Sequence, residues 1–191
     1  MDTPRKEYPN PQFERSNWQN LNGDWDFGFK KAKRGFKFST DEKMAVEIHN
    51  ACDYPHKINV PFCLESELSG IGYTDFINLA WYRKKVTVNK GNNRVFLHIG
   101  AADYLTTVLV NSRPVGRHKG GYTSFKFEIT DFVSEGENEI FILCEDDVKN
   151  ALVCRGNRAS AARATDATIR EQRGSGRRFI WNTFRKIILK T

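Results

Sequence analysis

The chain has 191 residues, of which 39% are hydrophobic and 13% aromatic. This is enough apolar material for one domain with a real core, and it argues against global disorder. The formal net charge of +7 is uneven: residues 1–156 hold 21 Lys and Arg against 21 Asp and Glu, whereas residues 157–191 hold 9 against 2. A neutral globular part does not favour a nucleic-acid partner. No apolar run approaches the ~18 residues of a membrane helix, so no membrane partner is expected either.

The cysteines and the N-terminus indicate a reducing compartment. The first residues lack the apolar segment of a secretory signal, which makes the cytoplasm the default location and leaves a periplasmic or extracellular parent open as the alternative. Four cysteines show neither a CxxC pair nor metal-ligand spacing: Cys52, Cys63, Cys144 and Cys154. We therefore favour free thiols over disulfides, and expect no metal and no cofactor.

The N-terminal third begins with residues 1–15, an extended lead-in that contains three prolines. A turn at Asn22–Asp24 precedes Trp25–Phe29, which alternates like a half-buried strand. Residues 30–56 show no clean period, so a loop, a short helix and an edge strand all remain open.

From residue 81 the pattern is repeatedly that of strands. Trp81–Val88, Arg94–Ile99 and Tyr104–Val110 alternate or are rich in β-branched residues. A hairpin turn is expected at Asn111–Pro114. Two further strands follow, with apolar residues at Phe125, Phe127 and Ile129 and then over Glu139–Cys144. Short strands separated by turns every 8–12 residues indicate an all-β antiparallel sandwich, here over residues 16–156.

Several segments, in a fixed order, carry a family resemblance. They are Val60–Ser66, Gly70–Phe76, Ala80–Lys84, Gly100–Tyr104, Val108–Asn111, Gly116–Tyr122 and Glu145–Asp147. Together they resemble the N-terminal sugar-binding domain of glycoside hydrolase family 2, the β-galactosidase and β-glucuronidase group. The resemblance covers about residues 8–156 and implies a jelly-roll sandwich that is similar to galactose-binding domains.

The resemblance also implies where the chemistry of the family lies. Retaining glycosidases use two carboxylates about 5 Å apart, and in this family both lie in a separate α/β barrel downstream. Glu65 and Glu67 are a poor catalytic pair, because a solvated or loop-ordering role suits them better. We therefore expect no catalytic residue here and no hydrolysis by this chain alone. Its partners would be that barrel, as a packing surface, and a carbohydrate bound by the parent enzyme.

In the family, loops of the jelly roll reach the edge of the barrel's pocket, and the loop after Val60 is the best match here. Its candidate sugar-facing or interface residues are Glu65, Ser66, Tyr73, Asp75 and Asn78. Carboxylates and amides hydrogen-bond to sugar hydroxyls, and an aromatic face stacks on a pyranose ring. The equally supported alternative is that Asp75 and Asn78 order the loop while Tyr73 packs beneath it.

Two other side chains, Trp81 and His118, are of types that can bind ligands or metals, but we favour structural roles for both. Trp81 heads a strand, where core packing is a better interpretation than ligand stacking. His118 follows a turn without a second ligand at metal spacing, so it is expected to be a hydrogen-bonding residue.

The last 35 residues break the strand pattern. Family members continue from Arg155-Gly156 as Arg-Gly-Lys-Gln and later carry a segment like Tyr-Thr-Arg-Thr-Thr-Gly-Ile-Trp-Gln-Thr-Val. Codons can be chosen for Ile169–Trp181 that encode such a segment when read one base earlier. We therefore interpret residues 157–191 as a basic, poorly ordered tail translated out of frame, and expect the strand that closes the sandwich to be missing. A natural divergent tail is the alternative.

Two other function classes remain as alternatives. A free-standing carbohydrate-binding module would need an exposed aromatic platform and a stable fold of its own. A nucleic-acid-associated protein would use the Arg-rich tail and would bind with steep salt dependence. The neutral globular part makes the second the weaker of the two.

Overall fold

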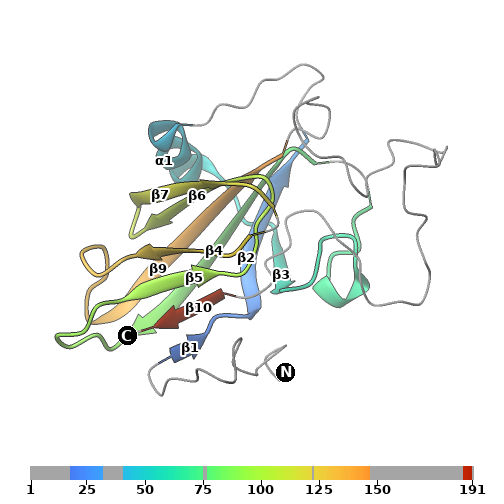
Figure 1. Cartoon of the computed structure of the whole chain (residues 1–191). Coiled ribbons are helices and arrows are strands. Elements are labelled where there is room, and N and C mark those ends of the chain that lie inside the picture. The colour runs from blue at the N-terminus through green and yellow to red at the C-terminus, as the bar shows by residue number, and fades with distance from the viewer. Residues whose placement is uncertain (1–17, 32–40, 75–76, 122, 147–186, 191) are drawn as a thin grey trace.

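Two antiparallel β-sheets face each other in the computed structural model, which describes residues 18–31, 41–74, 77–121, 123–146 and 187–190. The larger sheet has six strands in the order β3-β2-β4-β9-β6-β7, and the smaller has four in the order β1-β10-β5-β8. Figure 1 shows β5 and β10 on one side of the larger sheet and the helix α1 on the other. The fold is thus the β-sandwich that the sequence predicted.

The larger sheet consists of β3 (His56–Val60), β2 (Gly23–Lys30), β4 (Leu79–Val88), β9 (Gly136–Glu145), β6 (Leu105–Val110) and β7 (Arg113–Lys119). The smaller sheet consists of β1 (Trp18–Asn20), β10 (Ile187–Lys190), β5 (Phe96–Ile99) and β8 (Phe125–Glu128). A ten-residue helix, α1 (Glu42–Ala51), precedes β3, and a 3₁₀ turn, η2 (Glu67–Ser69), lies between β3 and β4.

Alternation along the strands separates two apolar layers. In β4, Ala80 and Tyr82 point into the core between the sheets, whereas Leu79 and Trp81 point to the outer face. β9 repeats this pattern with Ile140 and Ile142 inside and with Phe141 and Leu143 outside. Both sets are buried because α1 covers the outer one (Figure 1). A strand that is buried on both faces reads as a continuous apolar run, as 140–144 does.

Within residues 30–56, for which a loop, a short helix and an edge strand were all left open, Glu42–Ala51 form the short helix α1. Asp41 caps its N-terminus, where the carboxylate accepts a hydrogen bond of 2.8 Å from the backbone N–H of Met44. Ala45 is fully buried against the outer apolar layer. The helix ends where the N–H of Cys52 reaches the carbonyl of Ile48. A short amphipathic helix thus covers the outer apolar layer of the larger sheet.

The hairpin expected at Asn111–Pro114 is confirmed. Asn111 and Ser112 have φ values of 50° and 62°, the left-handed pair that fits the twist of a two-residue hairpin. The Asn111 side chain also donates hydrogen bonds to Phe132 O (2.9 Å) and Asn138 Oδ1 (2.8 Å). It accepts one from the N–H of Glu139 at 2.9 Å. This turn therefore ties β6 and β7 to the start of β9.

One expectation about the tail is wrong for its last residues. Ile187–Lys190 form β10, which pairs with β1 on one side and with β5 on the other. The strand closes the sheet because it is rich in β-branched and apolar residues, and Leu189 is buried opposite Leu97. The lead-in (residues 1–15) and the rest of the proposed out-of-frame tail (157–186 and 191) lie outside the described residues.

Candidate functional site

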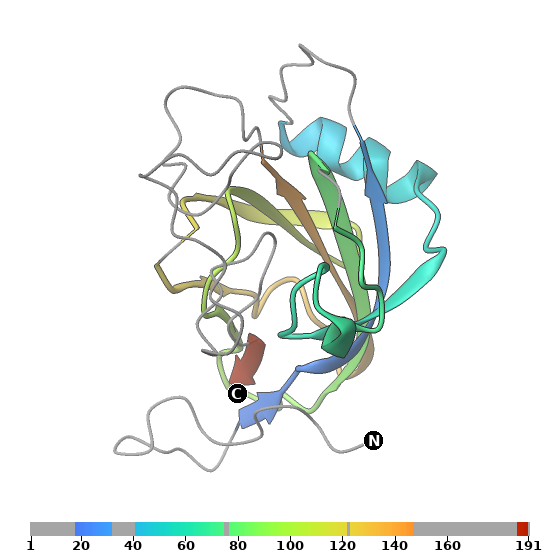
Figure 2. The ribbon, with the colours of Figure 1, turned by 90° about the vertical axis from the view of Figure 1, so that its right-hand side faces the viewer.

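The 61–78 loop, which runs from β3 to β4, carries all five candidate residues. Leu64 and Ile77 are buried in the main core, and Ile71 and Tyr73 pack against it. Figure 2 shows this loop, with η2, in front of the strands of the sandwich. These apolar side chains therefore anchor the loop to the core of the sandwich.

The turn η2 gives the loop a fixed shape. The Ser66 hydroxyl accepts a hydrogen bond of 3.2 Å from the N–H of Leu68. The Ser69 hydroxyl donates to Ser66 O (2.6 Å) and accepts from the N–H of Ile71 (3.1 Å). Gly70 ends the turn with a left-handed φ of 81°. Ser66 is thus a capping residue, as serine commonly is at the start of a helical turn.

Tyr73 and Glu65 are both half-buried in this loop. The Tyr73 N–H donates to Leu64 O at 3.0 Å, and its ring lies 4.7 Å from the ring of Phe29. This contact is the packing role that the sequence offered as an alternative.

Burial, with a smaller contribution from the Glu65 charge, raises the pKa of the neighbouring Cys63 thiol. Cys63 is therefore an inert thiol rather than a nucleophile.

Asn78 fastens the end of the loop to the end of β9. Its carbonyl accepts a hydrogen bond of 2.9 Å from the N–H of Asp146, and its Nδ2 donates to Asp146 O at 3.4 Å. Asp75 lies outside the described residues. Glu65, Ser66, Tyr73 and Asn78 therefore lie in described parts of one loop, and their contact with a sugar or another domain remains a prediction.

Two buried acids next to this loop were not singled out by the sequence as site residues. Glu145 and Asp146 are 2% and 1% exposed, although both are carboxylic acids. The sequence could have pointed to these two acids, because they directly follow the apolar run of β9. Acids rarely enter a protein core without partners, so acids at such a position are worth examining as site residues.

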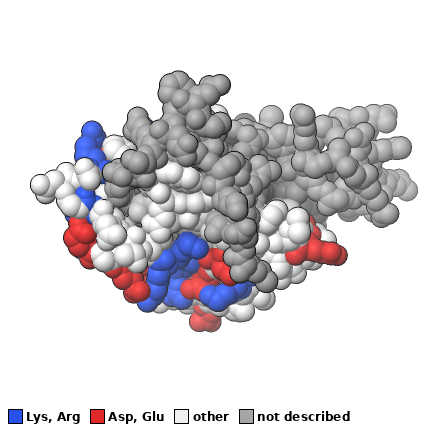
Figure 3. All heavy atoms as spheres, turned by 90° about the horizontal axis from the view of Figure 1, so that it is seen from below, with Lys and Arg blue, Asp and Glu red and all other residues white. Residues whose placement is uncertain are grey.

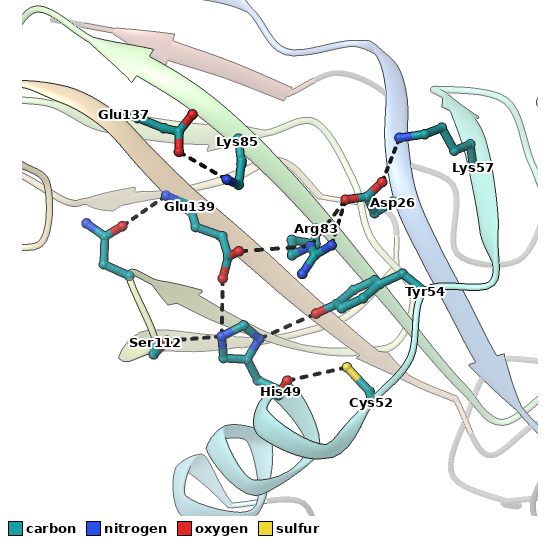
Figure 4. A network of polar contacts seen from close by, with 11 residues as sticks. Asp26, His49, Cys52, Tyr54, Lys57, Arg83, Lys85, Ser112, Glu137 and Glu139 are labelled. Carbon is teal, nitrogen blue, oxygen red and sulfur yellow. Dashed lines mark hydrogen bonds and ion pairs between the residues drawn. The ribbon is translucent and has the colours of Figure 1, made fainter.

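A polar network crosses the outer face of the larger sheet beside α1 (Figure 4). Asp26 accepts hydrogen bonds from Lys57 Nζ (2.7 Å) and from Arg83 (3.0 and 3.2 Å). The Lys57 hydrogen bond, aided by Arg83 and opposed by burial, lowers the pKa of the Asp26 carboxyl. Arg83 also lies 3.9 Å from Glu139 Oε2 and stacks on the Tyr54 ring at 3.8 Å. The network thus links strands β3, β2, β4 and β9.

His49, in the last turn of α1, completes this network. Its Nε2 lies 3.2 Å from Glu139 Oε1 and 3.0 Å from Ser112 Oγ, and its Nδ1 lies 3.4 Å from the Tyr54 hydroxyl. Because a carboxylate can only accept, we assign the proton to Nε2 and let Nδ1 accept from Tyr54. Burial lowers the pKa of His49, against a smaller opposing effect of Glu139. The neutral ring therefore fastens the helix to the sheet.

Ser112, His49 and Glu139 contain the residue types of a hydrolytic triad, but their geometry differs from one. A triad needs the carboxylate at Nδ1 while Nε2 serves the serine. Here the serine hydroxyl and the carboxylate both face Nε2. These residues are structural, and sequence reasoning missed them because their separation along the chain hides the contact.

The remaining candidates have packing roles. Trp81 is 8% exposed, and its indole N–H donates to Asp53 O at 2.9 Å, which confirms the packing interpretation. His118 stacks on Phe125 at 3.9 Å and lies 3.5 Å from the Thr123 hydroxyl, as expected for a hydrogen-bonding residue. Cys52, Cys63 and Cys144 are free thiols, while Cys154 lies outside the described residues.

The described surface gives little support to a free-standing carbohydrate-binding module or to a nucleic-acid-binding protein. Across the described ranges, no group of three or more His, Cys, Asp or Glu could hold a metal ion, and no helix is long and apolar enough to cross a bilayer. Basic and acidic atoms lie side by side on the face seen in Figure 3. Among the described large hydrophobic side chains, the exposed ones are Met44 (44%) and Leu68 (65%), and neither is aromatic. The aromatic platform of a free-standing carbohydrate-binding module is thus not found there.

The fold and its loop define an antiparallel β-sandwich domain, which is similar to solved structures of β-glucuronidases. Bacteroides uniformis β-glucuronidase 2 superimposes with a TM-score of 0.58 over 90% of this chain and 17% of that one, at 22% identity. Ruminococcus gnavus β-glucuronidase gives 0.54 over 74% and 23%, at 19% identity. The chain belongs to glycosyl hydrolases family 2, whose sugar binding domain model matches residues 18–149.

Curated relatives agree with this assignment. A β-galactosidase of Thermoanaerobacter pseudethanolicus is 30% identical over 133 residues, which are 67% of this chain and 16% of that protein. A β-glucuronidase of Bacteroides fragilis is 29% identical over 143 residues, or 72% and 16%. The chain thus spans about one-sixth of the length of these relatives.

Proposed function

We propose that this domain is the non-catalytic N-terminal part of a glycosidase that acts on β-galactosides or β-glucuronides. The sandwich packs against a catalytic barrel, and the 61–78 loop lies at the edge of the barrel's pocket. Glu65, Ser66, Tyr73, Asp75 and Asn78 are then the residues that face the sugar or the barrel. The observation that carries this proposal is the family match over residues 18–149, a segment that corresponds to about one-sixth of the length of the relatives.

The shape of the 61–78 loop supports this assignment. The apolar side chains of its described part enter the core, and η2 fixes the backbone at Glu67–Ser69, so this part of the loop is preorganised before anything binds. A preordered loop loses little conformational entropy on binding, which favours a role in shaping a pocket. Leu68, 65% exposed at the turn, adds an apolar contact for a neighbouring domain.

The test begins with the encoding DNA. One A inserted after the Gly156 codon should restore Arg-Gly-Lys-Gln and open a long frame that encodes a barrel with two catalytic glutamates. We expect the product of that frame to hydrolyse an aryl β-galactoside or β-glucuronide. A stop codon soon after the insertion, or a long product with neither activity, would contradict the proposal.

The role of the loop is tested in the same long product. Glu65→Gln should raise KM about tenfold, which corresponds to about 1.4 kcal/mol, because it removes a half-buried carboxylate from the pocket edge. Glu67→Gln is the matched control, since Glu67 is exposed two residues away. Equal KM values for both variants and the unchanged enzyme would show that Glu65 does not contact the substrate.

A further inference from the structure

Four strands of the larger sheet end level with one another. Leu79, at the start of β4, pairs with Glu145 at the end of β9, and Glu145 also pairs with Leu105 at the start of β6. Leu105 in turn pairs with Lys119 at the end of β7. Three steps between neighbouring strands separate Leu79 from Lys119, a distance of about 14 Å. The residues just beyond this row therefore lie along one end of the sheet, and Asn78 is one of them.

Backbone hydrogen bonds continue past this row. The N–H of Asp146 donates to Asn78 O at 2.9 Å. The N–H of Tyr104 donates to Glu145 O at 3.2 Å, and the N–H of Gly120 donates to Tyr104 O at 2.7 Å. We call Asn78, Asp146, Tyr104 and Gly120 the rim. The rim thus connects the end of β7 with the candidate residue Asn78 through backbone groups.

A close contact between Gly121 and Asp103 lies at the far end of the rim from Asn78. A Cβ built at Gly121 would lie 2.5 Å from Asp103 Oδ1 and 2.6 Å from Asp103 Cγ. Gly121 follows Gly120 along the chain, and Asp103 precedes Tyr104, so this contact joins the same two rim segments a second time. Because these distances are too short for a real Cβ, any larger residue at position 121 must displace the Asp103 side chain or the rim backbone.

We propose that Gly121 and Asp103 are positioning residues, which determine through the rim where Asn78 lies at the pocket edge. This inference rests on the proposed function, in which Asn78 faces the sugar or the barrel. The Asn78 side chain is itself bound to the rim, because its Nδ2 donates to Asp146 O at 3.4 Å. A displacement of the rim at Gly120 is therefore passed on to the Asn78 side chain through a contiguous chain of hydrogen bonds.

The side-chain amide of Asn78 in the 191-residue chain reports this coupling by ¹H–¹⁵N NMR. Gly121→Ala should shift the Asn78 side-chain NH₂ signals. Asp103→Ala removes the two closest atoms, so Gly121→Ala should shift these signals less in that background. Gly116→Ala is the matched control, because its Cβ would lie 2.6 Å from Phe127 Cε1, but in the middle of β7 and away from the rim. This control should leave the Asn78 signals in place.

Each outcome has a defined meaning. Unmoved Asn78 signals in folded Gly121→Ala, or equal shifts in Gly116→Ala, would overturn the inference, since equal shifts would indicate a general loosening of the fold. Equal shifts from Gly121→Ala with and without the Asp103 carboxylate would exclude that contact as the cause and would also overturn it.

Asp103→Ala alone carries the test where Gly121→Ala does not fold, because it removes the contact without adding an atom. It should then shift the Asn78 signals, and unmoved signals would overturn the inference. These measurements use no sugar, so their outcome is separate from hydrolysis by the long product, which tests the proposed function.

Discussion

Gly28 lies in β2 directly opposite Trp81 of β4, and its replacement by alanine is expected to destabilise the fold. A Cβ built at Gly28 would collide with Trp81 Nε1 and lie 2.7 Å from the carbonyl oxygen of Asp53. The same indole nitrogen donates a hydrogen bond of 2.9 Å to that oxygen. The added methyl group therefore collides with both partners of one partly buried hydrogen bond.

The magnitude follows from two effects. Overpacking of a filled site costs about 1–3 kcal/mol, and loss of the Trp81–Asp53 hydrogen bond costs about 1 kcal/mol more. Together they lower the free energy of unfolding by about 2–4 kcal/mol. For a chain of this size we expect the Tm to fall by about 4–16 °C.

Thermal unfolding followed by circular dichroism measures this fall, and a double-mutant cycle assigns its cause. Trp81→Phe removes the indole nitrogen, so Gly28→Ala should cost at least about 1 kcal/mol less in that background. Thr87→Ala, on the exposed face of β4, is a control that should change stability by less than about 0.5 kcal/mol. A Tm of Gly28→Ala within about 1 °C of the unchanged chain, or an equal cost in both backgrounds, would refute the reasoning.

Three further substitutions test other parts of the structure. Phe141→Ala should lower the free energy of unfolding by about 3–5 kcal/mol in urea titrations, because this buried ring supports α1; a cost below about 1 kcal/mol would contradict that role. Asp26→Asn should cost about 0.5–1 kcal/mol at pH 7, since its partner Lys57 is 73% exposed. Because the folded-state pKa of Asp26 is lowered, this difference should shrink as the pH falls below the ordinary aspartate pKa of about 3.9. A pH-independent difference would disprove the charge effect. The pKa of His49 is also lowered in the folded state, so the unfolded chain takes up its proton first, and stability should decline as the pH falls through the ordinary histidine pKa of about 6.5. His49→Gln should flatten this decline, and an identical urea midpoint profile would count against it.

The sequence predicted the sandwich because most of its signal is local. Trp25–Phe29 and Trp81–Val88 alternate strongly, and both lie within strands of the larger sheet. The hairpin at Asn111–Pro114 was equally readable, since asparagine tolerates a positive φ. Alternation and turn chemistry depend on neighbouring residues alone, so a single sequence suffices to find them.

Contacts between distant segments could not be predicted in this way. His49 and Ser112 meet only because α1 folds over the larger sheet. The helix itself was one of three alternatives, although the Asp41 cap was a usable signal. β10 was missed because its four residues follow a long basic sequence without a strand pattern, and because its place is decided by pairing with the distant strands β1 and β5.

The central claim, that this is the non-catalytic domain of a family 2 glycosidase, is tested most directly by turnover. The purified 191-residue chain, produced in a host without endogenous glycosidases, is assayed with aryl β-galactoside and β-glucuronide. The Thermoanaerobacter β-galactosidase serves as a positive control for the galactoside. We predict no hydrolysis above the blank by the chain alone. Saturable hydrolysis that co-purifies with the chain and is lost in Glu65→Gln would contradict the account.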